Sequence, residues 1–316
     1  MMTRREAAEF LRQGDRYCIL THRRPDGDTI GTAAALCLGL RKLGKTAHVL
    51  ENSEVTQRFG WLLEGLTVET AGEEDTVLAV DVASPGMLPK AFAPYLGRVA
   101  LRIDHHGSAT SFTERELVDP LAGACSEIVY DILTELGVEL DGQIAEAVYV
   151  ALSTDTGCFR FSNTTDHSFR TAAACAAAGA RIYRLNQELF ETNTLSKLRM
   201  HAWIVENMKL LDGGKLAVVA IPRAVEELLG VTEDDMDNIS SFPRTVAGVC
   251  MAATLRQTKE GDTKISVRAV PGYDAAAVCA VFGGGGHKGA AGASTQMELS
   301  QAAKALEEAM LRSPQG

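Results

Sequence analysis

One stretch near the N-terminus decides the fold: YCILTHRRPDGDTIGTAAALCLGLRKLG, residues Tyr17–Gly44. Its first residues, Tyr17–Thr21, form an apolar run that ends on a polar residue, which is typical of a buried strand. Apolar residues then recur at positions 30, 33, 37, 40 and 43. This spacing predicts a helix over Thr29–Leu43 that ends at Gly44. The stretch therefore predicts a strand, a polar loop and a helix in direct succession.

The same alternation continues along the N-terminal part. Thr76–Asp81 is a second apolar run with a polar end, and Arg98–Asp104 is a third, in which apolar and basic residues alternate. Strands that alternate with helices predict a parallel, doubly wound sheet. In such a sheet, ligands bind beyond the carboxyl ends of the strands. We therefore expect an α/β fold with a mainly parallel sheet, whose strand ends carry the functional residues.

A second, smaller α/β domain is predicted beyond a helical linker. Helical patterns over Arg181–Glu191 and Lys197–Leu211 indicate the connection. The elements expected after it are a strand at Lys215–Ile221, a hairpin of Thr245–Gln257 and Thr263–Val270 joined by Thr258–Asp262, a helix from Asp274, a glycine-rich loop and a terminal helix. The predicted boundaries are 1–185 for the first domain, 186–205 for the linker and 206–316 for the second domain.

Length and composition limit the class of protein. A chain of 316 residues, 46% of them hydrophobic, has enough apolar material for two globular cores and is not intrinsically disordered. Its uncharged runs reach only twelve residues, and Met1–Leu20 carries charges. A membrane span needs about 18–20 apolar residues, so we expect a cytoplasmic protein with no membrane partner. Seven cysteines without a Cys-x-x-Cys pair indicate reduced thiols rather than disulfides or a thiolate zinc site.

Acidic residues dominate the charge. The chain has 31 Lys and Arg residues and 41 Asp and Glu residues, so its net charge is −10 with neutral histidines. Residues 1–195 carry −9 of this, whereas residues 196–316 carry −1 and include a local excess of three positive charges over 240–297. Long duplexes are bound through many Lys and Arg contacts that release counterions. The charge therefore argues against a long duplex nucleic acid as partner.

A cluster of potential metal ligands follows the first predicted strand. The loop THRRPDGDTIG (Thr21–Gly31) carries His22, Asp26 and Asp28, and leads into the predicted helix. An imidazole and two carboxylates on such a loop can converge on a hard divalent cation. The alternative is that Asp28 caps the helix and that Pro-Asp-Gly forms a turn. The loop alone leaves both interpretations open.

Three further sites lie at predicted ends of strands or helices. Asp81 ends one strand, Asp104-His105-His106 ends the next, and Asp155 follows the helical pattern Gln143–Leu152. Adjacent histidines point in different directions, so one can bind a metal while the other faces a substrate, and Asp104 can hold an imidazole tautomer. Each site alone is compatible with a simple turn. Four such sites in one sheet together predict a centre for two metal ions.

A glycine-rich segment in the second part predicts an anion site. FGGGGHKGAAG (Phe282–Gly292) has four successive glycines, whose N–H groups can turn inward as a nest, followed by the cationic donors His287 and Lys288. The alternative is a flexible hinge. Isolated residues elsewhere are interpreted as structural: His48 on a predicted edge strand, His201 in the helical connection, and Asp166 with His167 in the first turn of a helix.

The clusters together resemble the motifs of the DHH phosphoesterases. His22-x-x-Pro25-Asp26-x-Asp28, Asp81, Asp104-His105-His106 and Ser153-Thr154-Asp155-Thr156-Gly157 look like the four motifs of that family. The segment Gly283–Gly292 is similar to the signature of its associated C-terminal domain. The resemblance covers nearly the whole chain. In length, the chain most resembles stand-alone members that act as nanoRNases and as phosphatases of 3′-phosphoadenosine 5′-phosphate (pAp).

The resemblance implies a role for each matched residue. One Mn²⁺ would be held by His22, Asp26 and Asp81, and the other by Asp28, Asp81, His105 and Asp155, with Mg²⁺ or Co²⁺ as substitutes. His106 would face the scissile phosphate, with Asp104 as the second catalytic residue. In the second domain, a terminal phosphate or nucleotide would be held by Arg268, His287, Gly283, Gly284, Gly285 and Gly286.

These roles imply metal-assisted hydrolysis of a phosphate ester. Two ions about 3.5–4 Å apart would activate a hydroxide, and His106 would stabilise the phosphoryl oxygens or protonate the leaving oxygen. The expected substrates are pAp and RNAs a few nucleotides long. Signalling dinucleotides such as cyclic di-AMP or pApA, pyrophosphate or polyphosphate, and a non-catalytic nucleotide sensor remain as alternatives. The sequence leaves the cleavage polarity and the oligomeric state open, with a homodimer as one expectation.

Overall fold

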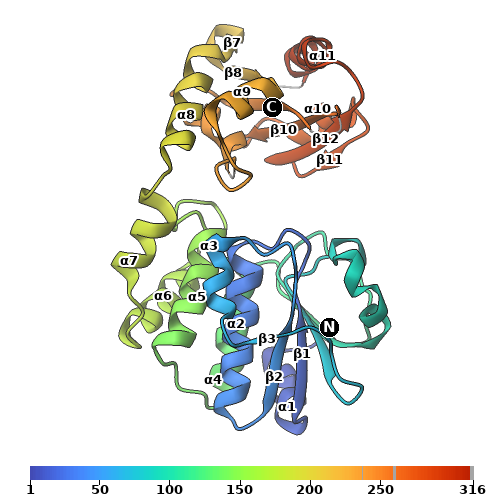
Figure 1. Ribbon diagram of the computed structural model, residues 1–316, viewed down its shortest axis with the longest axis vertical. Coiled ribbons are helices and arrows are strands. Elements are labelled where there is room, and N and C mark those ends of the chain that lie inside the picture. Colours follow the sequence, from blue (N-terminus) through green and yellow to red (C-terminus); the bar gives the residue numbers. More distant parts are fainter. Residues whose placement is uncertain (237, 259–260, 314–316) are drawn as a thin grey trace. The chain divides into compact units, whose positions relative to one another are not determined.

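The computed structural model describes residues 1–236, 238–258 and 261–313. The chain divides into two compact units, Met1–Thr192 and Asn193–Gly316 (Figure 1). Each unit has a six-stranded sheet and a hydrophobic core of its own. The division between Thr192 and Asn193 falls within the segment 186–205 that the sequence predicts as the linker.

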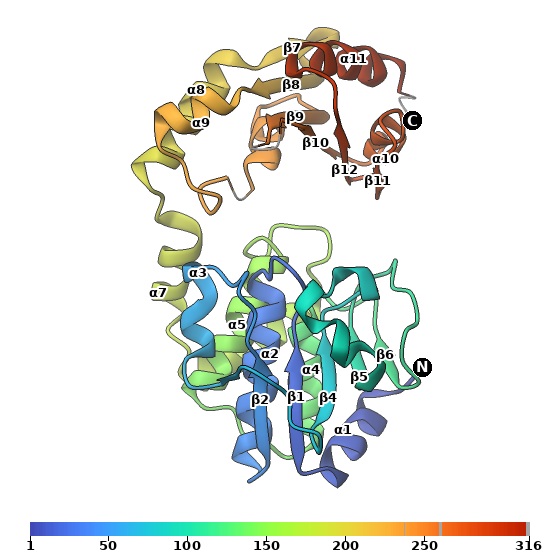
Figure 2. The same ribbon diagram turned by 45° about the vertical axis from the view of Figure 1, so that its right-hand side comes forward.

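Every strand pair in the sheet of the first unit is parallel. The strands follow the order β3-β2-β1-β4-β5-β6, of which Figure 2 labels β2, β1, β4, β5 and β6. Their bounds are β1 (Arg16–Leu20), β2 (Thr46–Leu50), β3 (Thr67–Val68), β4 (Thr76–Val80), β5 (Val99–Asp104) and β6 (Glu116–Val118). The predicted parallel α/β sheet is therefore confirmed. The central strands are buried along nearly their whole length, which explains the continuous apolar runs of β1 and β4.

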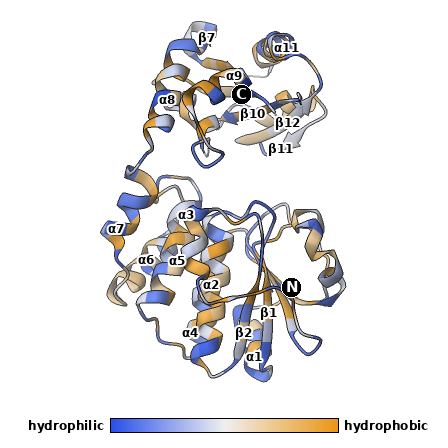
Figure 3. Ribbon diagram, in the orientation of Figure 1, coloured by the Kyte–Doolittle hydropathy of each residue, from blue (hydrophilic) through white to orange (hydrophobic). Residues whose placement is uncertain are grey.

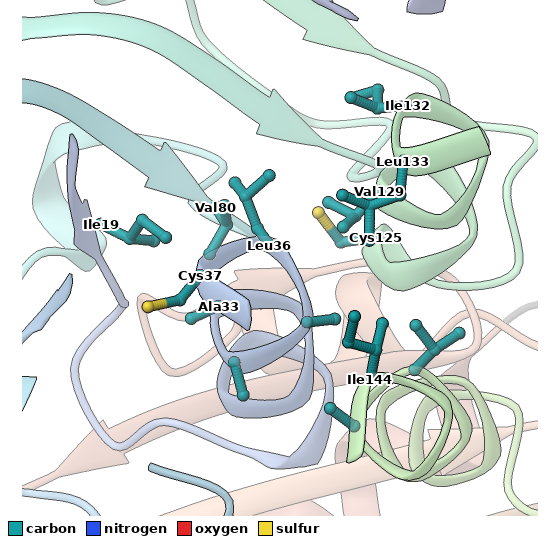
Figure 4. Packing of buried hydrophobic residues seen from close by; sticks show 14 of the residues in the cluster. Ile19, Ala33, Leu36, Cys37, Val80, Cys125, Val129, Ile132, Leu133 and Ile144 are labelled. Atoms are coloured by element: carbon teal, nitrogen blue, oxygen red, sulfur yellow. The ribbon is translucent and has the colours of Figure 1, made fainter. Parts of the chain in front are cut away.

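Helices cover one face of this sheet (Figure 1). They are α1 (Arg4–Gln13), α2 (Gly27–Lys42), α4 (Cys125–Glu135) and α5 (Gly142–Asp155). Figure 4 shows Ile19 and Val80 of the sheet close to Leu36 of α2, with side chains of α4 and α5 packed in the same core. The hydrophobic residues of β1, β2 and α2 stand out in Figure 3. Helix α2 is buried almost throughout because it lies between the sheet and two other helices.

Short 3₁₀ helices cover the other face of the sheet. They are η2 (Pro85–Met87) and η3 (Lys90–Arg98). Leu88 and Phe92 from this region pack against strand residues such as Leu20 and Ala79. The other helical elements of this unit are α3 (Gln57–Gly60), η1 (Trp61–Leu63), α6 (Asp166–Ala177), α7 (Ile182–Asn186) and the π-helix η4 (Gln187–Glu191).

The second unit contains a mixed sheet in the order β11-β12-β10-β9-β8-β7. Its strands are β7 (Lys209–Leu211), β8 (Leu216–Ile221), β9 (Met251–Gln257), β10 (Thr263–Ala269), β11 (Gly285–Gly286) and β12 (Ala290–Thr295), and β8 and β9 pair in parallel. Its helices are α8 (Leu195–Asn207), η5 (Asp212–Gly214), α9 (Arg223–Leu229), η6 (Ile239–Thr245), α10 (Ala275–Ala280) and α11 (Leu299–Arg312). This arrangement confirms a second, smaller α/β unit.

Three local predictions are wrong. The helix predicted to reach Leu211 ends at Asn207, because residues 209–211 pair with β8 as strand β7. The strand predicted from Thr245 begins only at Met251. His48 does not lie on an edge strand, because β2 pairs with both β1 and β3. The predicted turn Thr258–Asp262 includes residues 259 and 260, which lie outside the described residues.

All seven cysteines are free thiols, and five of them are buried, as their number and spacing predict. Burial raises the pKa of the Cys18 thiol to about 12, which keeps it protonated. Among the residues that the structure describes, no helix combines the length and the apolar character that crossing a bilayer requires.

Gly31 allows close packing between α2 and α5. A Cβ atom at this position would lie 2.4 Å from the carbonyl oxygen of Ala147. Gly31→Ala is therefore expected to destabilise the first unit by about 1–3 kcal/mol and to lower its melting temperature by roughly 2–12 °C. Thermal denaturation followed by circular dichroism measures this effect. Gly97→Ala is the matched control, because nothing lies within 4 Å of a Cβ there; an unchanged melting temperature for Gly31→Ala would contradict the expectation.

Candidate metal centre

The predicted metal ligands come together at one edge of the first sheet. His22 follows β1, Asp81 follows β4, and His105 follows β5. These three strands are parallel neighbours, so their carboxyl ends lie side by side. Asp26 and Asp28 stand at the start of α2, and Asp155 is the last residue of α5. The described residues contain three groups that could hold a metal ion: His22–Asp26–Asp81, Asp28–His105–Asp155 and Asp81–His105–His106.

In the first group, His22 faces two carboxylates. Its Nε2 atom lies 3.4 Å from Asp81 Oδ2 and 3.7 Å from Asp26 Oδ1. The ring is oriented by Nδ1, which donates to the carbonyl oxygen of Arg23 at 2.8 Å. Asp26 is the N-cap of α2, since its side chain accepts hydrogen bonds from the first amides of that helix. The cap is therefore Asp26 and not Asp28, and the Asp26 side chain is 60% exposed to solvent.

In the second group, His105 faces three carboxylates. Its Nε2 atom lies 3.5 Å from Asp28 Oδ2, 3.6 Å from Asp81 Oδ1 and 3.7 Å from Asp155 Oδ2. Its Nδ1 atom lies 3.2 Å from the carbonyl oxygen of Ala122. A carbonyl can only accept, so Nδ1 carries the proton and Nε2 is left to bind a cation.

Asp81 links the two groups. One of its carboxylate oxygens faces His22, and the other faces His105. The Oδ1 atom is buried and has no hydrogen-bond partner. The backbone of Asp81 has φ 57°, a left-handed conformation that is uncommon outside glycine, while its N–H donates to Ile103 at 2.8 Å. Backbone strain of this kind concentrates at functional sites.

The carboxylates repel one another. Burial, and then the charge of Asp28, raise the pKa of Asp155 to about 7 and raise that of Asp81 well above its ordinary value. Burial alone would lower the pKa of His22, but its hydrogen bonds to Asp26 and Asp81 raise it to about 11. A divalent cation would relieve this repulsion and would satisfy the unpartnered Asp81 oxygen. Oxygen and nitrogen donors without a thiolate fit such a cation.

His106 belongs to a different arrangement from His105. Its Nδ1 atom lies 2.8 Å from Asp104 Oδ1 and 3.5 Å from Asp81 Oδ1. Asp104 is fully buried, and its Oδ1 atom also accepts from the backbone N–H groups of His105 and His106. The hydrogen bond to Asp104 raises the pKa of His106. Because Nδ1 is committed to Asp104, the Nε2 atom is the one available to a substrate.

The glycine segment of the second unit forms a turn between α10 and a hairpin. Gly283 donates its N–H to Ala280 and Gly284 donates to Cys279, each at 3.0 Å. The predicted anion nest is therefore wrong for these two amides, because they end the helix. Gly284 leaves no space for a side chain, since a Cβ would lie 2.2 Å from the carbonyl oxygen of Gly292. Gly285 and Gly286 form β11 and pair with β12.

Cationic side chains remain available in this region. His287 and Lys288 are exposed in the turn between β11 and β12. Arg268 on β10 pairs with Ala290 in the neighbouring strand and is half-buried, so that burial lowers the pKa of its guanidinium. Its Nη1 atom donates to the Val267 carbonyl, and no carboxylate pairs with it among the described residues.

Sequence reasoning missed several residues that hold the ligands. Thr32 donates its hydroxyl to Asp28 Oδ1 at 2.9 Å, a contact that their spacing of one helical turn indicates. Asn52 donates to Thr21 and to the carbonyl of His22, and Asn163 donates to Asp155. No local pattern marks these two asparagines, because their contacts are distant in the chain: Asn52 lies 30 residues from His22, and Asn163 lies 40 residues from Gly123.

The chain matches two known protein domains and is similar to proteins of described function. Residues 16–152 match the N-terminal domain of the DHH family, and residues 215–311 match the DHHA1 domain. The bifunctional oligoribonuclease and PAP phosphatase NrnA of Thermus thermophilus is 33% identical over 97% of this chain and 93% of that protein. The protein of the same description from Bacillus subtilis is 27% identical over 89% of each chain.

Solved structures share the fold. An exopolyphosphatase-related protein from Bacteroides fragilis superposes with a TM-score of 0.86, 21% identity and coverage of 98% of this chain and 95% of the other. Exonuclease RecJ bound to manganese superposes with a TM-score of 0.51, 17% identity and coverage of 100% and 96%. With the clustered carboxylates and imidazoles, these findings define the chain as a hydrolase of the phosphoesterase class. It belongs to the DHH family, which confirms the prediction from its motifs.

Proposed function

We propose that the chain hydrolyses RNAs a few nucleotides long to mononucleotides and removes the 3′-phosphate of pAp, with two divalent cations, preferably Mn²⁺. The observation that carries this proposal is the pair of ligand groups that share Asp81. Support for the substrates comes from the two curated relatives, which match this chain over most of their length and are described as oligoribonuclease and PAP phosphatase.

The ligands divide between the two cations. His22, Asp26 and Asp81 would hold one cation, and Asp28, Asp81, His105 and Asp155 the other. Bound divalent cations supply an activated water and neutralise charge on a phosphoryl group. Mixed carboxylate and imidazole ligands suit Mn²⁺, with Mg²⁺ or Co²⁺ as substitutes. The side chain of Asp26 is the most exposed of the six proposed ligands, so water and substrate would reach the centre from this side.

His106 is proposed to act as a hydrogen-bond donor or general acid towards the substrate. Its Nδ1–H donates to Asp104, and this hydrogen bond favours the protonated ring because it raises the pKa of His106. The opposite atom, Nε2, would donate a hydrogen bond to a phosphoryl oxygen or a proton to the leaving oxygen. Asp104 would keep the ring in this orientation, since it is buried and accepts three hydrogen bonds from residues 105 and 106.

A short substrate agrees with the charge of the chain. With a net charge of −10, binding is expected to depend on a few placed cationic groups rather than on a long basic track. Arg268 and His287 of the second unit are proposed to bind a terminal phosphate or nucleotide. Gly285 and Gly286 would let the backbone approach it closely, since both lack side chains and are exposed.

A substrate panel tests the proposed function. The metal-free chain would be supplied with Mn²⁺ or Mg²⁺ and offered pAp, RNA dinucleotides, 20-mers, pApA, cyclic di-AMP and pyrophosphate. Release of mononucleotide and phosphate would be followed by chromatography. We expect cleavage of pAp and dinucleotides, and faster turnover with Mn²⁺. Faster cleavage of 20-mers or of cyclic di-AMP would contradict the substrate class, and no metal-dependent release from any compound would contradict hydrolysis itself.

Arg268 provides a separate prediction. Arg268→Met keeps the aliphatic stem and removes the guanidinium, so it is expected to raise KM for pAp by about 10-fold or more. The value of kcat should change less, because this residue would bind the substrate rather than act on the reacting bond. Lys304→Met is the control, since it removes one exposed positive charge from α11. An unchanged KM for Arg268→Met would contradict the assigned contact.

A homodimer and a cytoplasmic location are also proposals. The location is proposed from the absence of a long apolar run in the sequence, whereas the sequence itself leaves the oligomeric state open. Analytical ultracentrifugation of the full chain would measure the oligomeric state, and a single species with the mass of one chain would contradict the dimer.

A further inference from the structure

One short segment, Ala122–Ser126, supports two of the three ligands in the Asp28–His105–Asp155 group. We call it the support segment. The carbonyl oxygen of Ala122 orients His105 through its Nδ1 atom, at 3.2 Å. At the start of α4, the N–H groups of Cys125 and Ser126 donate to the two carboxylate oxygens of Asp28, at 2.7 and 3.2 Å. Asp28 and His105 are thus held by the same few residues.

The third ligand, Asp155, is connected to this segment through Asn163. The Nδ2 atom of Asn163 donates to Asp155 Oδ2 at 3.2 Å, to the Asp155 carbonyl at 3.2 Å and to the Gly123 carbonyl at 2.8 Å. All three partners are acceptors, so the amide must present its NH₂ group to them, and its two hydrogens are shared among the three acceptors. One side chain therefore joins a metal ligand to the support segment.

The surroundings of Gly123 leave little freedom for movement. A Cβ atom at this residue would lie 2.7 Å from Ser168 Oγ, 2.9 Å from Glu127 Oε1 and 3.0 Å from the carbonyl oxygen of Asn163. The Gly123 N–H donates to Glu127, which is buried in α4. Ser168 is buried in the first turn of α6. The backbone at Gly123, to which Asn163 donates, is thus closely packed on the side where a Cβ would stand.

The other ligand group is oriented by different contacts. His22 is fixed by the Arg23 carbonyl, and Asp26 is fixed by the first amides of α2. Neither of these residues is hydrogen-bonded to Asn163. Loss of the Asn163 amide should therefore affect the two cations unequally.

We propose that Asn163 is a positioning residue for Asp155, and that it makes the Asp28–His105–Asp155 group a single unit with the support segment. On this basis, the affinity for one of the two cations depends on Asn163 and the affinity for the other does not. The inference rests on the proposed two-cation centre. Residues that orient metal ligands typically change metal affinity by about 10–100-fold when removed.

The test is a calorimetric titration of Mn²⁺ alone into the metal-free full chain. Two binding steps are expected for the wild type, and Asn163→Ala should weaken one step by about 10–100-fold and leave the other unchanged. Ser162→Ala is the matched control, because Ser162 is the exposed preceding residue and should leave both steps unchanged. The proposal would be overturned if Asn163→Ala bound Mn²⁺ at each step with the same affinity as the wild type. It would also be overturned if the variant weakened both steps by the same factor.

A double-mutant cycle separates positioning from a general structural effect. Because Asn163 acts through Asp155, adding Asn163→Ala to Asp155→Ala should weaken Mn²⁺ binding no further than Asp155→Ala alone. Additive losses would overturn the proposal. If the alanine variant does not fold, Asn163→Ser is the second variant, since serine is too short to join Asp155 to Gly123. Thermal unfolding checks that each variant is folded. Fewer than two Mn²⁺ ions on the wild-type chain would instead overturn the proposed two-cation centre, and this inference with it.

Discussion

Asp81→Ala is expected to lower kcat for a short oligoribonucleotide in saturating Mn²⁺ by about 1,000-fold or more. Asp81 is the residue that both ligand groups share, with one oxygen towards His22 and the other towards His105. In the proposed two-cation centre, its loss would remove a ligand from both cations at once, whereas loss of Asp26 or Asp155 would remove a ligand from one. Single-turnover kinetics and the stoichiometry of bound Mn²⁺ would be measured on the same preparation.

The control for Asp81 must respect its backbone. Because Asp81 has φ 57°, alanine adds conformational strain, while asparagine tolerates the left-handed region well. Asp81→Asn therefore keeps the shape of the residue but removes its negative charge and replaces one carboxylate oxygen by an NH₂ group, and we expect a loss of similar size. Asp15→Ala, on a side chain that is 92% exposed, controls for the change in net charge. Wild-type turnover in Asp81→Asn would show that the shared ligand is assigned wrongly.

His106→Ala is expected to lower kcat by about 100- to 10,000-fold, the usual contribution of a general acid or base. This substitution removes the proposed proton donor, Nε2, but leaves both proposed ligand groups intact. KM and the affinity for Mn²⁺ should therefore change little. His167→Ala is the matched control, because His167 of α6 pairs with Asp131 of α4 and belongs to none of the ligand groups.

The same variant distinguishes two roles for His106. Its Nδ1 atom lies 3.5 Å from Asp81 Oδ1, which is why His106 appears in the third candidate group. If this nitrogen bound a cation, His106→Ala would weaken Mn²⁺ binding together with kcat. The hydrogen bond of 2.8 Å to the buried Asp104 argues that the nitrogen is already occupied. A parallel loss of metal affinity and turnover would refute the proton-transfer role.

The clustering of the candidate ligands could be predicted because these residues directly follow, start or end regular elements. An apolar run such as Thr76–Val80 can be identified from its composition, and the residue after it must lie at the sheet edge. The strands β1, β4 and β5 are parallel neighbours, so their carboxyl ends lie side by side. Predicting that these ends converge therefore requires no knowledge of contacts between side chains that are distant in the sequence. The same reasoning failed at residues 209–211, where helical spacing continues but pairing with β8 imposes a strand.

Sequence alone therefore determined the two α/β units, the order of the motifs and the set of residues able to bind cations. Only the tertiary structure decided how those residues are held: by Asn163, by the support segment and by Asn52. It also decided that the amides of Gly283 and Gly284 end α10 instead of forming an anion nest. The physical reason is that strands and helices follow local periodicity, whereas hydrogen bonds such as Asn163 to Gly123 join residues 40 apart in the chain.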